Sequence, residues 1–134
     1  FTILYLNSEK GMIGLAIHEI IHFVWFFVWN RLFQDSYEDY ESPSLKWILS
    51  EIVVDPIMRD PRLSSINPYF PRENGGCIYP YFFDMQVDGK LILDTLDTMY
   101  RSQPMEDFMK NSYAYCLAHE AEIREHIRRS EENF

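Results

Sequence analysis

The segment that decides the fold covers residues 12–33 and reads MIGLAIHEIIHFVWFFVWNRLF. Its apolar residues recur every three or four positions, which predicts one long helix. The segment is apolar almost all round, so we expect this helix to be central and buried in the core. Three polar residues interrupt its apolar middle: His18, Glu19 and His22.

The two histidines are spaced to bind one metal ion. Residues four apart lie on the same face of a helix, so the imidazoles of His18 and His22 can reach the same ion. Glu19 lies beside them and can accept a proton from a water molecule at that metal. Burying these three groups together is costly, and a metal ion offsets the cost. The alternative interpretation is a pair of hydrogen-bonded core histidines with an exposed Glu19.

The string His18-Glu19-Ile20-Ile21-His22 is an HExxH motif, and in it the chain resembles the zincins, a class of zinc metallopeptidases. The metzincin branch continues the motif as HExxHxxGxxH, but Trp25 and Val28 occupy the last two defining positions here, which excludes that branch. The gluzincin branch, which includes thermolysin, takes its third ligand from an ExxxD pattern on a second helix. Glu51-Ile52-Val53-Val54-Asp55 matches that pattern.

The gluzincin resemblance covers about residues 1–58. It implies a zinc ion held by His18, His22 and Glu51. It also implies that Asp55 accepts a hydrogen bond from a ligand histidine and so fixes its orientation. Alternative third ligands lie on the last predicted helix: His119, Glu122 and His126.

The same resemblance implies a mechanism. Glu19 acts as the general base, and a tyrosine or histidine from later in the chain donates a hydrogen bond to the developing oxyanion. For this donor the sequence offers Tyr113 and His119 first, and then Tyr115, Tyr79 and Tyr81.

The rest of the sequence predicts a mostly helical α+β fold in a single domain over residues 1–134. The expected core is zincin-like, with the HExxH helix packed on a helix over residues 45–55. We expect Ser42 or Ser44 to cap that second helix, and Pro56 to end or kink it. The other expected elements are a strand at 2–6, an irregular connection at 56–80, a hairpin at 82–93 around Asp88-Gly89, and helices at 91–100 and 104–129.

Charge narrows the classes of partner. The formal net charge of -9 disfavours a nucleic-acid partner, because neutralising phosphates needs an excess of Lys and Arg. We expect a peptide or protein substrate, a cytoplasmic location and no membrane partner. A spanning helix needs about 20 apolar residues, and the uninterrupted apolar run here is only Phe23 to Trp29. The chain begins with Phe1, so we expect a processed chain or a fragment of a longer one.

Together these features predict a zinc-dependent hydrolase, specifically a metallopeptidase with Zn²⁺ as its cofactor. One alternative is a non-catalytic or degenerate zincin domain that binds zinc and serves in binding. Another is a fragment of a membrane-embedded metalloprotease. The fourth coordination position separates the first two, because a catalytic zinc keeps it for water and a structural zinc fills it with a fourth protein ligand.

Overall fold

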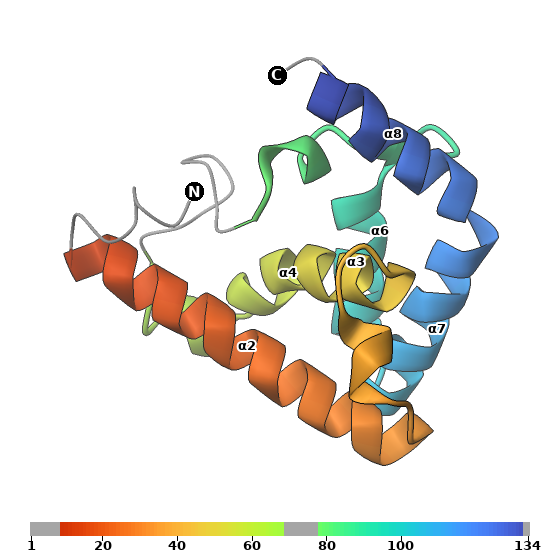
Figure 1. Ribbon diagram of the computed structural model, residues 1–134. Coiled ribbons are helices and arrows are strands. Elements are labelled where there is room, and N and C mark those ends of the chain that lie inside the picture. The colour runs from red at the N-terminus through yellow and green to blue at the C-terminus, as the bar shows by residue number, and fades with distance from the viewer. Residues whose placement is uncertain (1–8, 69–77, 133–134) are drawn as a thin grey trace.

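The computed structural model describes residues 9–68 and 78–132, and these residues form a mostly helical fold with one short antiparallel hairpin (Figure 1). The predicted α+β, mostly helical class is confirmed. The strand predicted at residues 2–6 lies outside the described residues. The elements in chain order are α2 (Glu9–Phe33), η1 (Tyr37–Tyr40), α3 (Leu45–Ile52), α4 (Val54–Met58), α5 (Pro61–Ser64), η3 (Pro80–Phe82), β1 (Gln86–Val87), β2 (Lys90–Leu91), α6 (Ile92–Ser102), α7 (Met105–Ala118) and α8 (Glu120–Glu132).

The central element is formed by α3 and α4. These two short helices run back along α2 in the opposite direction and lie between α2 and the pair α6 and α7 (Figure 1). Their side chains are almost completely buried, with Leu49, Ile52, Val53 and Val54 fully enclosed. The expectation that α2 is the buried central helix was therefore wrong, because the second helical segment has that position.

One face of α2 is an apolar stripe exposed to solvent. It contains Met12, Ile13, Ile20, Phe23, Val24 and Phe27, which follow one another at helical spacing. By length and composition α2 could cross a membrane, and only 28% of its most apolar window is buried in the protein. The opposite face packs on α3 and α4 and carries the buried His18. Helical periodicity alone could not show which of two apolar faces is covered.

The second helical segment begins and breaks at specific residues. Ser44 caps α3, as one of the two predicted caps, because its hydroxyl accepts a hydrogen bond from the Trp47 amide at 3.1 Å. Pro56 does not end the helix at Asp55, which corrects the prediction. The break comes earlier, at Val53, and Pro56 lies in the first turn of α4, where an amide would have no partner within the helix.

The predicted hairpin is confirmed but is short. Gln86 pairs with Leu91 and Val87 pairs with Lys90. The turn residues Asp88 and Gly89 both have positive φ, 53° and 76°, as the tight two-residue turn requires. Of the flanking residues that were predicted as part of the hairpin, Phe82 belongs to η3, residues 83–85 are irregular, and residues 92–93 begin α6.

Asp35 fixes the end of α2 against the start of α3. Its carboxylate accepts a hydrogen bond from the Trp29 indole at 2.9 Å and lies 2.8 Å from the Lys46 ammonium. The Asn30 amide donates to the Asp35 carbonyl at 2.6 Å. These contacts define how the two helices face each other, and therefore which side chains meet between them.

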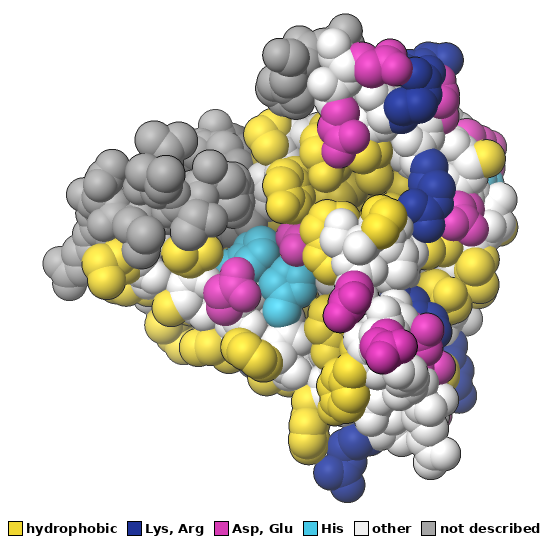
Figure 2. All heavy atoms as spheres, in the orientation of Figure 1, with side chains coloured by type: hydrophobic (Ala, Val, Ile, Leu, Met, Phe, Trp, Pro, Cys, Tyr) yellow, Lys and Arg dark blue, Asp and Glu magenta, His cyan; other side chains and the backbone are white. Residues whose placement is uncertain are grey.

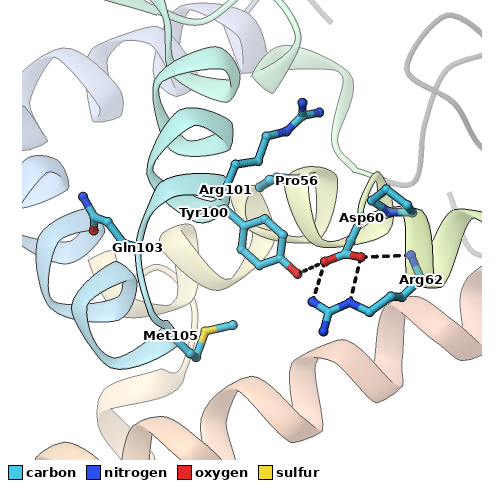
Figure 3. A pocket seen from close by; sticks show the side chains of 8 residues that line it. Pro56, Asp60, Arg62, Tyr100, Arg101, Gln103 and Met105 are labelled. Carbon is cyan, nitrogen blue, oxygen red and sulfur yellow. Dashed lines mark hydrogen bonds and ion pairs between the residues drawn. The ribbon is translucent and has the colours of Figure 1, made fainter.

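A second polar tie joins α5 to α6, beside a hollow of about 360 Å³. Asp60 caps α5, and its carboxylate accepts hydrogen bonds from the Tyr100 hydroxyl at 2.7 Å and from the Arg62 guanidinium at 2.7 and 3.0 Å (Figure 3). The hydrogen bonds from Arg62 and Tyr100 hold the pKa of Asp60 well below its ordinary value. This tie holds the segment after α4 in place.

Candidate metal centre

Three potential metal ligands meet between α2 and α3. His18 and His22 come from α2, one turn apart, and Glu51 comes from the last turn of α3. The Nε2 atoms of the two histidines are 3.0 Å apart. The Nε2 atom of His18 lies 3.5 Å from Oε2 of Glu51, and that of His22 lies 3.3 Å from Oε1. One donor atom from each side chain lies within 4.8 Å of the other two.

These separations are compatible with a shared metal ion. Neighbouring ligand atoms around a tetrahedral ion with bonds of about 2.0–2.1 Å lie about 3.3 Å apart. The two Nε2 atoms are 3.0 Å apart, and each lies 3.3 or 3.5 Å from a different oxygen of the Glu51 carboxylate. Imidazole and carboxylate are common ligands of divalent metal ions. The residues present therefore fit a metal ion.

The group is largely buried. His18 is 5% exposed and Glu51 is 8% exposed, while His22 is partly buried. Burial alone would raise the pKa of Glu51, but hydrogen bonds from His18 and His22 outweigh it and lower the pKa to about 2. Glu51 is therefore ionised at neutral pH, as a metal ligand must be.

The predicted third ligands lie in different groups of side chains. Glu51 meets the two motif histidines, as the resemblance implied. His119 and Glu122 belong to a separate, more exposed group with Asp88. His126 lies near Asp84 at 3.1 Å and the Tyr81 carbonyl at 2.9 Å.

Two further predicted residues lie close to the ligands in the sequence. Glu19 directly follows His18, is exposed, and lines a groove together with His22. Asp55 is buried on α4, and its Oδ2 lies 3.7 Å from Nη1 of Arg59. The role of Asp55 in orienting a ligand histidine stays a prediction.

The two predicted oxyanion donors lie in other surroundings. Tyr113 packs edge-on against Trp29, with the Lys46 ammonium 5.8 Å from its ring centroid. His119 lies between two carboxylates, at 3.5 Å from Asp88 and 3.8 Å from Glu122. The structure brings neither Tyr113 nor His119 into the His18–His22–Glu51 group, and their catalytic roles stay predictions.

The charge of Glu51 contributes to the raised pKa of two tyrosines, Tyr79 and Tyr81. For Tyr79, burial raises the pKa most, followed by the charges of Glu51 and Glu19. Its ring stacks on Tyr81 at 5.4 Å and lies 6.2 Å from Trp47 of α3. The sequence offered it only as a secondary candidate, because its approach to α3 depends on packing between distant segments.

Sequence reasoning also missed an aromatic groove beside the motif. Besides Glu19 and His22, its lining residues are Phe23, Phe26, Phe27, Tyr37, Tyr40 and Glu41, and its volume is about 440 Å³. Figure 2 shows histidine side chains on this face of the molecule, with acidic and hydrophobic side chains around them. The available signal was the aromatic spacing on α2 together with the tyrosines three residues apart on η1.

No known family model, curated protein or solved structure matches the chain. Membership of the zincins is therefore not shown, and the resemblance rests on the HExxH motif and the ExxxD pattern of this sequence. What stands on the structure itself is a His-His-Glu group that could hold a metal ion.

Proposed function

We propose that this chain is a zinc-dependent hydrolase that cleaves peptide bonds, with zinc held by His18, His22 and Glu51. The observation that carries the proposal is the convergence of the three side chains, in which one donor atom from each lies within 4.8 Å of the other two. Three protein ligands are the number found in catalytic zinc sites, which keep one coordination position for water or substrate. Zinc bound there would lower the pKa of water and polarise a carbonyl group.

The chain's own residues supply the proton transfers. Glu19 follows a ligand histidine and faces the groove next to the other, so its carboxylate can accept a proton from water and pass it to the leaving amine. Tyr79 joins Tyr113 and His119 as a candidate oxyanion donor, because a phenol donates hydrogen bonds and the charges of Glu51 and Glu19 contribute to its raised pKa.

The first test is metal binding. We expect the purified chain, stripped with a chelator and titrated with Zn²⁺ in a calorimeter, to bind one ion per chain. His22→Ala removes a ligand and should weaken binding by about a hundredfold or more. His126→Ala is the matched control, because that histidine also pairs with a carboxylate but lies outside the group. Equal zinc binding by both variants would exclude this site.

The second test is hydrolysis of unfolded casein by the zinc-loaded protein. Glu19→Gln should keep zinc and reduce the cleavage rate by about 10²- to 10⁴-fold, because only the base is removed. Glu131→Gln, which alters an exposed glutamate near the end of α8, should leave the rate unchanged. A wild-type protein that binds zinc and cleaves nothing would support the non-catalytic zinc-binding alternative instead.

A further inference from the structure

The groove beside the metal-binding group has aromatic walls built from two elements. Phe26 of α2 stacks on Tyr40 of η1, with ring centroids 4.6 Å apart and planes tilted by 19°. Tyr37 packs edge-on against Tyr40 at 5.5 Å. Phe23 and Tyr37 present their rings to solvent, with 76% and 63% exposed. The groove therefore offers both a packed aromatic floor and open aromatic edges.

The groove is continuous with the metal-binding group. His22 belongs to both, and its ring lies parallel to that of Phe26 with centroids 6.2 Å apart. Glu19, the proposed base, lines the same groove. A substrate whose scissile bond lies at His22 and Glu19 therefore places a neighbouring side chain among the aromatic rings.

The charged side chains among the described lining residues of the groove are acidic, Glu19 and Glu41. A guanidinium lies next to the groove, since that of Arg31 is 5.4 Å from the ring centroid of the lining residue Phe27. The whole chain also has a formal net charge of -9. An acidic side chain is repelled there, whereas an aromatic or large apolar side chain buries its surface against the rings.

From these observations we propose that the α2–η1 groove is the specificity pocket of the enzyme, and that it binds an aromatic or large apolar side chain next to the scissile bond of a neutral or basic peptide. The inference rests on the proposed function, since it takes its position from the metal site. It adds the class of substrate and the residues that select it.

The test compares hydroxamates, which bind zinc through the same group whatever side chain they carry. Affinities of the zinc-loaded protein are measured for the hydroxamates of glycine, phenylalanine and aspartic acid. We expect the phenylalanine compound to bind at least about tenfold more tightly than the glycine compound, and the aspartic acid compound to bind more weakly than either. This readout requires bound zinc but no catalytic activity.

Two variants test whether the groove is the source of the side-chain selectivity. Phe23→Ser and Tyr37→Ser change exposed rings, so the fold should persist, and each should lower the phenylalanine-to-glycine affinity ratio toward one while glycine hydroxamate binds as before. Leu117→Ser is the control, since Leu117 is half exposed on α7. Equal wild-type affinity for the phenylalanine and glycine compounds, or an unchanged ratio in both variants, overturns the groove and leaves the hydrolase proposal standing. A chain that takes up no zinc overturns both.

Discussion

At the scale of single residues, the polar side chains that hold this fold together work in small, closed groups. Asp60 satisfies its carboxylate with Tyr100 and Arg62, and Asp35 does the same with Trp29 and Lys46. Each group joins two helices: the Asp35 group joins α2 to α3, and the Asp60 group joins α5 to α6. The metal-binding group differs, because its three donor atoms face one another rather than a cation.

Replacing Tyr100 by Phe should lower the free energy of unfolding by about 1–2 kcal/mol, because it removes a hydrogen bond to an ionised carboxylate. The pKa of Asp60 is depressed in the folded state, so its contribution is fully present above the ordinary pKa of 3.8 and is lost as the pH falls from there through the lower pKa of the folded state. Urea unfolding at neutral and acidic pH should show the difference between wild type and variant shrinking in acid. Tyr37→Phe is the control, because Tyr37 is mostly exposed.

The residues of the candidate site were predictable to different degrees. His18 and His22 follow from helical periodicity, since a spacing of four fixes their common face. Glu51 could be chosen only through the family resemblance, because nothing local distinguishes it from other acidic residues. The positions of Tyr79 and of the η1 rings near the site depend on how separate segments pack. Local sequence patterns do not predict that packing.

At the scale of elements, the main helices were predicted from the sequence, but their burial was not. The helix α2 was expected to be central and buried, whereas α3 and α4 have that position. The apolar content of α2 exceeds what its buried face needs, whereas α3 and α4 are short and enclosed on all sides. Hydrophobicity indicates that a face can be buried, not that a partner covers it. The expectation of no membrane partner rested on the short uninterrupted apolar run from Phe23 to Trp29, and it stays a prediction.

Because α3 is the centre of the fold, Leu49→Ala should cost about 2–5 kcal/mol of stability, the usual cost of a cavity at a fully buried leucine. Leu117→Ala makes the same chemical change at a half-exposed position on α7 and should cost less than about 1 kcal/mol. Chemical unfolding of the two variants measures the contrast. Similar losses at both positions would contradict the central place of α3.

The exposed stripe of α2 should make the chain associate with apolar surfaces. We expect the double variant Ile20→Gln/Val24→Gln to bind about half as much of a hydrophobic fluorescent dye as wild type, because both side chains are more than half exposed. Ile66→Gln changes an isolated exposed residue and should have little effect. Unchanged dye binding by the double variant would show that the stripe does not behave as one apolar surface.

At the scale of the whole molecule, the metal-binding group lies where the outer helix α2 meets the central helix α3. A metal ion there joins two elements that otherwise contact through one face of α2. Ligand atoms from both helices come together only in the folded state, so binding of a metal ion there would be coupled to folding. A bound ion would then help to hold α2 in place.

Zinc should therefore stabilise the folded chain, by about 2.7 kcal/mol at a free zinc concentration one hundred times the dissociation constant. Thermal unfolding with zinc and then with excess chelator measures the gain. His22→Ala should lose most of it, because a ligand from α2 is missing, whereas Glu19→Gln and His126→Ala should keep it. This pattern separates the proposed base from the proposed ligands by stability alone. An equal gain in His22→Ala and wild type would mean that zinc stabilises the chain elsewhere, and the link between α2 and α3 would then have to come from packing and from Asp35.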